Sequence, residues 1–318
     1  MLGFVVANGI SPIQTDWGNC TDRPDPEIVY IDARNLTVSG QLNSEENYAR
    51  LSQKYRDRVR PPVWSLSRHS AGINIRFKTN SPEIWVKWEL AEFSHKGNMT
   101  AIGASGLDLY CKVGSGWQYV NSGTPQAKFT EVSLISEMDG TLKEFLINLP
   151  LYSSVIKLEV GILEGSVIER GEKFSNSEAP IVFYGTSITQ GASASRPGMA
   201  YPSIISRNLD METINLGFSG NGRFEQSVGQ VLCDASPGLI VIDCTPNSSP
   251  EVIQENAFDL LFQIRGCHPN VPILMVESIL REYSHFKTAD DTVFGSASYI
   301  RKQNQTLQLA YKKAVDSG

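Results

Sequence analysis

Ser187 is the residue of this sequence around which a reaction is most readily built. It lies in the turn Gly185-Thr186-Ser187, directly after the apolar run at residues 181–184. Such a run is typical of a strand buried on both faces, and open α/β sheets bind ligands where their parallel strands end. A serine hydroxyl held there, beside backbone N–H groups, can act as a nucleophile in a reaction that develops an oxyanion. The same residues could equally form a turn that caps a helix.

Two later loops place further polar groups after predicted strands. The stretch Asn215-Leu216-Gly217-Phe218-Ser219-Gly220-Asn221-Gly222-Arg223 begins in one strand, and Asp243-Cys244-Thr245-Pro246-Asn247 ends another. Because the carboxyl ends of parallel strands meet at one edge, we expect both loops to converge with Ser187 on a single site. Asp243 has no second carboxylate beside it, so we expect it to cap a helix or brace a loop rather than bind a metal.

These ordered blocks resemble the SGNH (GDSL) hydrolase superfamily, which carries a serine in a Gly-x-Ser turn, then a glycine, an asparagine and a final Asp-x-x-His. The sequence is closer still to a subgroup with a β-rich N-terminal domain and a Gly-x-Asp-Leu-Tyr signature. The matching segments are Gly106-Leu107-Asp108-Leu109-Tyr110, Tyr184-Gly185-Thr186-Ser187-Ile188-Thr189-Gln190-Gly191, Ser195-Arg196-Pro197-Gly198 and Asn215-Leu216-Gly217-Phe218-Ser219-Gly220. Since they lie in both halves, the resemblance covers residues 28 to 316.

The resemblance implies a role for each matching residue. Ser187 would attack an ester carbonyl and form an acyl-enzyme. Its own N–H, the N–H of Gly220 and the side-chain amide of Asn247 would form the oxyanion hole, where one donor is typically worth about 3–4 kcal/mol of barrier. Arg196 would line the substrate pocket. No cofactor and no metal are implied.

Two features depart from the superfamily pattern. Gly-Thr-Ser replaces the commoner Gly-Asp-Ser, as in the subgroup, and nothing matching Asp-x-x-His follows residue 247. We expect His268 to be structural, between a helix and the fourth strand at the edge opposite the site. His285 follows that strand on the correct edge but lacks the spacing. We therefore expect a chain truncated before its catalytic Asp and His, and a fragment without that base to be nearly inert.

The second half of the chain alternates strands with helices. We expect strands at 181–184, 213–216, 239–243 and 271–276, and helices at 199–208, 223–232, 250–265 and 299–315. This alternation predicts a parallel sheet with helices on both faces. The resemblance narrows the prediction to the three-layer α/β/α, flavodoxin-like SGNH hydrolase domain.

The first half has a different sequence pattern, in which short strand-like segments are separated by Gly, Ser, Asn and Pro. We expect strands at 28–31, 36–40, 63–66, 73–77, 84–90, 107–113, 144–149 and 155–160. Their number and spacing predict an antiparallel β-sandwich of jelly-roll type. The predicted organisation is an irregular segment at 1–25, the β-sandwich at 26–170, a linker at 171–180 and the hydrolase domain at 181–318.

Composition sets the broad class and excludes some partners. The 318 residues are 41% hydrophobic and 19% charged, as in a folded protein, and the length suits two domains. A net charge of −6 argues against a nucleic-acid partner, which would need a basic face. No segment is long and apolar enough for a transmembrane span. The apolar start at residues 1–8 lacks a basic beginning; we lean towards an exported protein, with a cytoplasmic one as the alternative.

Cysteine and histidine usage gives no sign of a metal centre. The five cysteines are scattered, with no CxxC pair and no Cys/His cluster, so a zinc site is not expected and one or two disulfides stay open. His69 and His95 are expected to be surface or hydrogen-bonded residues of the β domain.

The sequence thus predicts a cofactor-free serine esterase that cleaves short acyl esters, acetyl above all, on a carbohydrate or another small molecule. An acyltransferase would use the same residues. A noncatalytic carbohydrate-binding protein with a degenerate esterase domain is the alternative from another class. Four tryptophans could then stack on sugar, although we expect them to pack in the core: Trp64, Trp85, Trp88 and Trp117. A homodimer formed through the β domain is a further possibility.

Overall fold

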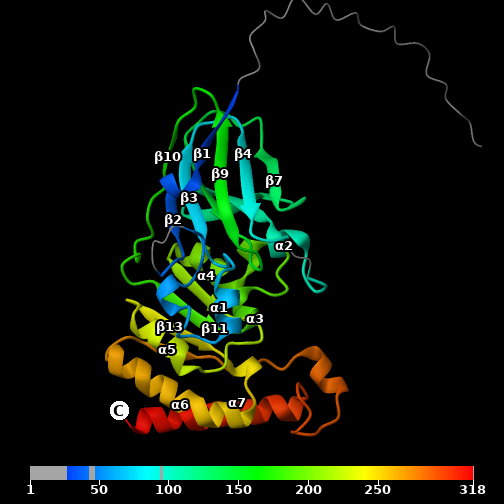
Figure 1. Cartoon of the computed structure of the whole chain (residues 1–318), viewed down its shortest axis with the longest axis vertical. Coiled ribbons are helices and arrows are strands. Elements are labelled where there is room, and N and C mark those ends of the chain that lie inside the picture. Colours follow the sequence, from blue (N-terminus) through cyan, green and yellow to red (C-terminus); the bar gives the residue numbers. More distant parts are fainter. Residues whose placement is uncertain (1–26, 43–46, 94–95, 318) are drawn as a thin grey trace, which may run out of the picture.

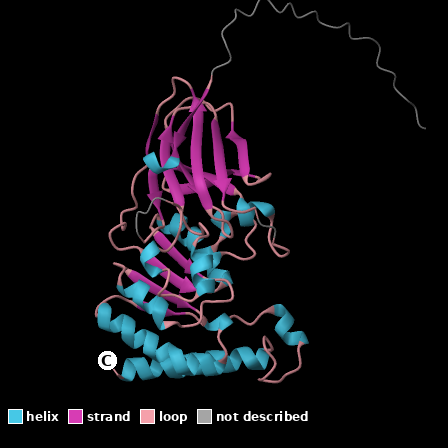
Figure 2. Cartoon of the chain, viewed as in Figure 1, coloured by secondary structure: helices cyan, strands magenta, loops and turns pink. Residues whose placement is uncertain are grey.

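The computed structural model describes residues 27–42, 47–93 and 96–317, in which a β-rich part is followed along the chain by an α/β part (Figure 1). The predictions for residues 1–25 and for His95 fall outside these ranges. Strands fill the first part, whereas helices surround the strands of the second (Figure 2).

The first part consists of two antiparallel sheets. Its elements are β1 (Ile28–Asp32), β2 (Thr37–Ser39), α1 (Pro61–Ser67), β3 (Asn74–Thr79), β4 (Ile84–Leu90), α2 (Ala101–Ser105), β5 (Leu107–Val113), β6 (Gly116–Gly123), β7 (Phe129–Ile135), β8 (Lys143–Asn148), β9 (Val155–Leu163) and β10 (Ile168–Arg170). One sheet has the order β1-β9-β4-β7, and the other has the order β10-β3-β8-β5-β6, with β2 paired to β3.

Apolar side chains from both sheets form the core of this part. Phe77, Trp88, Leu109 and Val160 are all essentially inaccessible to solvent and belong to one cluster. Buried side chains alternate with more exposed ones along β4, which is the predicted pattern for a strand with one face on a core. The antiparallel β-rich fold of this half is therefore confirmed.

The tryptophans do not form a single stacking platform. Trp88 lies in the sandwich core, where its indole N–H donates to the carbonyl oxygen of Ser105 at 3.1 Å. Trp64 packs against the core of the α/β part, and Trp117 packs against a separate small cluster. Core packing is thus the better description of these three side chains.

The strand predicted at 63–66 is wrong, because these residues lie in helix α1. Pro61 and Pro62 occupy its first turn, where the fixed φ of proline favours a helix start and its missing N–H is not needed. The prediction also missed β6, β7 and β10. Half of the residues of β6 are exposed, and the strand begins and ends with glycine, so its sequence lacks the apolar alternation that identifies a strand.

The second part is a parallel sheet with helices on both faces. Its elements are β11 (Ile181–Gly185), α3 (Ser187–Gln190), α4 (Tyr201–Leu209), β12 (Thr213–Gly217), α5 (Gln226–Cys233), β13 (Leu239–Asp243), α6 (Pro250–Cys267), β14 (Ile273–Met275) and α7 (Ala297–Asp316). The sheet order is β12-β11-β13-β14. Each predicted strand and helix is present with ends shifted by a few residues, which confirms the α/β fold.

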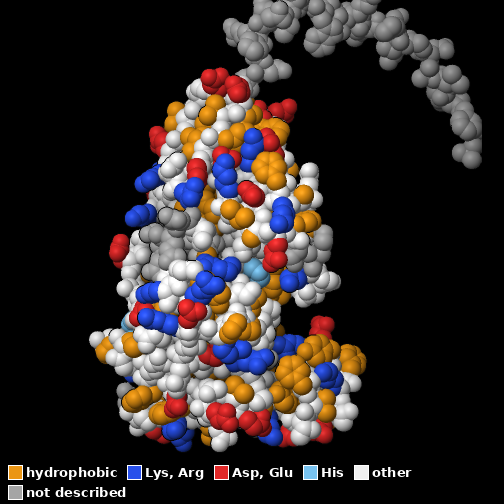
Figure 3. Space-filling model, in the orientation of Figure 1, with side chains coloured by type: hydrophobic (Ala, Val, Ile, Leu, Met, Phe, Trp, Pro, Cys, Tyr) orange, Lys and Arg blue, Asp and Glu red, His pale blue; other side chains and the backbone are white. Residues whose placement is uncertain are grey.

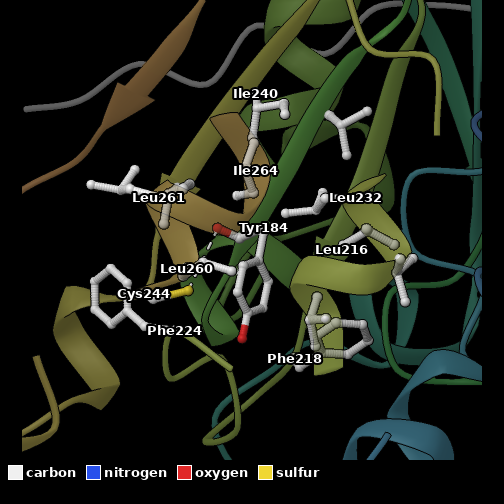
Figure 4. Close-up of a cluster of buried hydrophobic side chains, with 14 of the residues drawn as sticks. Tyr184, Leu216, Phe218, Phe224, Leu232, Ile240, Cys244, Leu260, Leu261 and Ile264 are labelled. Carbon is white, nitrogen blue, oxygen red and sulfur yellow. Dashed lines mark hydrogen bonds between the residues drawn. The ribbon is translucent and has the colours of Figure 1, made fainter. Parts of the chain in front are cut away.

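Successive side chains of the central strand β11 pack on opposite faces of the sheet. Val182 and Tyr184 belong to the large cluster covered by α5, α6 and α7, where Tyr184 lies near Leu260 (Figure 4). Phe183 points to the other face and meets Tyr201 of α4, with ring centroids 5.5 Å apart. A strand covered on both sides has no polar face, which explains the continuous apolar run in the sequence.

Apolar surface remains exposed beside the edge strand β14. A groove of about 570 Å³ lies between β14, α6 and α7, and Phe262, Tyr311 and Val315 line it; no predicted site residue does. Further apolar side chains gather on the segment before α7, where Phe286 is 90% exposed (Figure 3).

Within the described ranges, every helix falls short of the length and apolar character needed to cross a bilayer.

A disulfide joins Cys233 at the end of α5 to Cys267 at the end of α6. Cys111 and Cys244 are free thiols. One bridge was among the outcomes that the sequence left open.

Buried Arg50 connects the two parts of the molecule. Its guanidinium donates to the carbonyl oxygens of Leu66 at 2.6 Å and His69 at 3.0 Å. It also donates to Asn215 and Gly217 of β12, at 3.0 and 2.6 Å. Burial lowers the pKa of Arg50 to about 9, so the side chain stays cationic at neutral pH. One planar group thus holds the segment around α1 against the α/β sheet.

Replacing Arg50 by lysine should lower the free energy of unfolding by about 2–4 kcal/mol, because an ammonium group cannot reach four carbonyl oxygens fixed around a planar fork. Urea unfolding of both proteins measures the difference. Arg58→Lys, at an exposed position of the same segment, is the matched control. Equal effects of the two changes would contradict the role given to Arg50.

Candidate active site

The register of the parallel sheet brings three loops together. Gly185, at the end of β11, pairs with Gly217 of β12 on one side and with Asp243 of β13 on the other. The loops after these strands therefore start from one row. They also touch, since Phe218 N–H donates to the Gly185 carbonyl at 2.9 Å and a Cβ on Gly222 would collide with that same oxygen.

Ser187 is the first residue of α3 and is half-buried. The hydroxyl of Thr186 caps the helix by accepting from Ile188 N–H at 3.2 Å. Hydrogen bonding within the helix starts with Gln190 N–H donating to Thr186, so the N–H of Ser187 precedes the first helical bond. The turn therefore acts as a helix cap and also presents a hydroxyl and an unused N–H at the rim of the sheet.

Asn247 lies directly beside Gly220. It belongs to the short 3₁₀ helix η4 (Thr245–Asn247) after β13. Its amide fits its surroundings when the oxygen faces the backbone N–H groups of Gly220 and Asn221, each 3.3 Å away. Contacts of this length are weak, so a charged oxygen would compete well for the Gly220 N–H. The structure thus brings together the loops of all three predicted oxyanion-hole donors.

The segment containing Arg196 is held by the β-rich part. The Arg196 guanidinium lies 4.1 Å from the ring centroid of Tyr119, and its Nε is 3.6 Å from the carboxylate of Asp108. The hydroxyl of Thr100 donates to the carbonyl oxygen of Ser195 at 2.6 Å. Arg196 is therefore fixed against the β-sandwich, and its predicted place in a substrate pocket stays a prediction.

Asp108, from the Gly-x-Asp-Leu-Tyr signature, anchors this same segment. Its carboxylate is fully buried and accepts from Gly198 N–H at 2.7 Å and from the Asn148 amide at 2.8 Å. The guanidinium of Arg207 donates to the Gly198 carbonyl at 2.6 Å from the α/β side. Burial raises the pKa of Asp108 to about 6. The signature thus has a structural role, because it joins the β-sandwich to the chain that follows α3.

Asp243 braces helix α3, which begins with Ser187, in line with the bracing role expected from the sequence. Its carboxylate is buried and accepts from the hydroxyls of Thr189 at 3.0 Å and Tyr201 at 3.1 Å. Burial raises the pKa of Asp243 above its ordinary value. Among the described residues, no three His, Cys, Asp or Glu side chains lie close enough to share a metal ion.

None of the three described histidines makes a hydrogen bond to Ser187. His268 ends α6, and its Nε2 lies 2.8 Å from the carbonyl oxygen of Leu232, which fits a structural role. His285 is exposed in the 3₁₀ helix η5 (Glu282–Phe286). His69 is 9% exposed rather than a surface residue, and its ring contacts Gln190 of α3.

Gln190 is the site residue that sequence reasoning missed. It is fully buried and lies three positions after Ser187, so both side chains share one face of α3. The available signal was its place in the block that runs from Tyr184 to Gly191. A buried glutamine amide must find partners for its donors and its acceptor, and these partners come from two different parts of the chain.

Comparison with known proteins identifies the family. Residues 28–168 match the N-terminal domain of SGNH-hydrolase-type esterases named GxDLY, and residues 178–318 match the GDSL-like lipase/acylhydrolase family. A protein from Bacteroides ovatus described as GDSL-like lipase is 36% identical, with a TM-score of 0.85, over 92% of this chain and 84% of its own. The chain therefore belongs to the GDSL-like lipase/acylhydrolase family, with an N-terminal GxDLY domain.

More distant structures share the fold. The salicylyl-acyltransferase SsfX3 from a tetracycline biosynthetic pathway has a TM-score of 0.71 at 16% identity, over 92% of this chain and 82% of its own. An acetyl xylan esterase, Est2A, from the rumen bacterium Butyrivibrio proteoclasticus has a TM-score of 0.53 at 11% identity, over 91% and 87%. No curated protein is significantly similar in sequence.

The buried carboxyl of Asp108 should make stability fall as pH rises from 3.8 to about 6. In that window the folded protein keeps a proton on Asp108 that the unfolded chain has released, so raising the pH favours unfolding. The unfolding free energy of wild type relative to Asp108→Asn should therefore be highest at the acidic end of the window. Urea unfolding at several pH values measures it.

Asp259→Asn, at an exposed carboxyl of α6, is the matched control for the removal of one acidic group. A wild-type advantage over Asp108→Asn that grows with pH would show that ionised Asp108, rather than its protonated form, is the stable state in this site.

Proposed function

We propose that the protein is a serine esterase that uses Ser187 to cleave short acyl esters, acetyl esters above all, on a carbohydrate or another small molecule. The observation that carries the proposal is the contact of three loops at one sheet edge, where Gly222 packs on Gly185 and Asn247 lies beside Gly220. This contact supports a site in which the Ser187 hydroxyl, a backbone N–H and a carboxamide would face one ester carbonyl, the arrangement that acyl transfer requires.

In the proposed reaction the Ser187 hydroxyl oxygen bonds to the ester carbonyl carbon, and its proton passes to a general base that returns it to the departing alcohol oxygen. The carbonyl oxygen becomes an oxyanion, which the N–H groups of Ser187 and Gly220 and the Asn247 amide stabilise. The ester C–O bond breaks, and the alcohol leaves with a proton. Water then attacks the acyl-enzyme and releases the carboxylic acid. The proposal does not assign the general base to any of the three described histidines.

The acetyl and carbohydrate parts of the proposal are supported by distant relatives. The acetyl xylan esterase and a family two carbohydrate esterase from Cellvibrio japonicus, with a TM-score of 0.52 at 10% identity, share the fold. Acyl transfer to an acceptor other than water is the second candidate, because the acyltransferase SsfX3 is structurally closer than either, at a TM-score of 0.71. A noncatalytic carbohydrate-binding protein is less favoured, since Trp64, Trp88 and Trp117 lie in different clusters.

In the product of the whole gene, replacing Ser187 by alanine should abolish turnover of p-nitrophenyl acetate and labelling by a fluorophosphonate probe, because both need the hydroxyl as a nucleophile. The expected loss in kcat is at least about a thousandfold. Ser193→Ala, at an exposed serine just after α3, is the matched control.

Turnover or labelling that survives in Ser187→Ala would end the esterase proposal. Acetylated xylo-oligosaccharides, offered with and without an alcohol acceptor, then separate hydrolysis from transfer by the products formed.

Replacing Asn247 by alanine should lower kcat about 100- to 1,000-fold with little change in KM, because its amide is assigned to the oxyanion rather than to the substrate in its ground state. Steady-state kinetics with p-nitrophenyl acetate measure both constants. Asn208→Ala, at an exposed position of α4, controls for the loss of an asparagine. A change confined to KM would move Asn247 from the oxyanion hole to substrate binding.

A further inference from the structure

The buried amide of Gln190 joins the nucleophile helix to two other parts of the molecule. Its Nε2 donates to the carbonyl oxygen of Leu151 at 3.0 Å and lies 3.1 Å from Nδ1 of His69, both in the β-rich part. Its Oε1 accepts from the backbone N–H of Ser219 at 3.0 Å. Both amide hydrogens and the oxygen are therefore used, so the side chain has a single orientation.

The contact with Ser219 bears directly on the oxyanion hole. Ser219 precedes Gly220, whose N–H is one of the proposed donors, while Gln190 lies one helical turn from Ser187. The two segments also pack without a gap, because a Cβ on Gly217 would collide with the backbone nitrogen of Gln190. One glutamine thus sets the distance between the nucleophile and the loop that carries Gly220.

His69 completes the arrangement from the β-rich side. Because Gln190 Nε2 carries only donors, Nδ1 of His69 must accept, so the proton of the neutral ring is on Nε2. Burial, together with the positive charges of Arg50 and Lys96, lowers the pKa of His69 to about 3. The ring of Tyr152 lies 5.9 Å away, between centroids. In a protonated ring Nδ1 would carry a hydrogen that points at the Nε2 hydrogen of Gln190, and the hydrogen bond would break.

We infer that His69 and Gln190 are positioning residues, through which the β-sandwich fixes the loop that carries the oxyanion-hole glycine. This inference rests on the proposed function and deepens it. It gives the N-terminal domain a task in the reaction itself, because two of the three partners of Gln190 come from that domain. Neither residue touches the reacting atoms, so each acts by placing the N–H of Gly220.

Two pairs of variants test the assignment. Gln190→Met keeps the volume of the side chain and removes its amide, and His69→Leu removes the acceptor. Both should lower kcat about 10- to 100-fold with a smaller change in KM, since a small displacement of catalytic groups costs about this much. His69→Asn, whose amide oxygen can stand near the position of Nδ1, should restore most of the rate. Gln190→Glu places a second acceptor opposite the Nδ1 acceptor of His69 and should not restore the rate.

A purely structural role predicts a different result. Asn121→Ala removes a partly buried hydrogen bond to the carbonyl oxygen of Leu134, within the β-sandwich, and is the control for lost stability. It should lower the melting temperature and leave kcat unchanged. If Gln190→Met loses rate only in proportion to a matched loss of stability, or if His69→Asn is no better than His69→Leu, the positioning role is wrong.

Two further measurements do not depend on activity. Nitrogen NMR of His69 should show the neutral Nε2–H tautomer from pH 5 to pH 8, and hydrogen exchange at the Ser219 amide should speed up at least about tenfold in Gln190→Met. Titration of His69 within that range, or unchanged exchange at Ser219, would overturn the inference. If these results hold while the product of the whole gene lacks esterase activity, the proposed function fails and the fixing of the loop by Gln190 stands.

Discussion

Close contact between the loops at the end of the parallel sheet is the constraint on which the rest of the site depends. Gly185, Gly217 and Asp243 lie in one row across three strands, so the chains that leave them begin only a strand spacing apart. Two of these chains can remain together only where side chains are absent, as at Gly222 against the Gly185 carbonyl. A bulky residue there would separate Ser187 from Gly220 whatever the rest of the sequence did.

The second constraint is that the α/β part does not hold these loops alone. Arg50 donates to carbonyl oxygens of β12, and Asp108 holds the Gly198 N–H on the chain after α3. His69 and Leu151 accept hydrogen bonds from the side-chain amide of Gln190. The β-rich part thus contacts α3, the chain that follows it and β12, all of which lie between Ser187 and Gly220 in the sequence. A domain that served only as a separate binding module would not need buried polar contacts to each of these segments.

Much of the fold could be predicted because its elements carry strong periodic signals. The buried strand β11 and the long helices α6 and α7 follow from apolar patterns, and the placement of Ser187, Gly220 and Asn247 at strand ends follows from parallel topology. The prediction failed where context overrides pattern. The residues at 63–66 look like a strand but follow two prolines that start a helix, and exposed β6 is held by pairing with β5 rather than by its own apolar side chains.

The polar interface could not be predicted for a related reason. A histidine, a glutamine and an arginine far apart in sequence carry no sign of meeting, because their types are common on surfaces and only the fold buries them. The family resemblance drew attention to Asp108 and to the block around Gln190, but it did not predict which residues they contact. His69 lies in none of the family motifs, and its sequence context predicts only a surface position or an ordinary hydrogen bond.

Buried polar groups join two domains only at a high desolvation cost, so their presence at this interface needs a physical reason. Taking Arg50, Asp108 and Gln190 out of water is offset only when each finds well-placed partners, and apolar residues of similar volume often stabilise a fold as well or better. Hydrogen bonds, however, have direction, whereas apolar contacts tolerate small shifts. An apolar interface could keep the domains associated and still let the Ser219–Gly220 segment move relative to Ser187. Direction, rather than strength, is therefore the property that this interface supplies to the site.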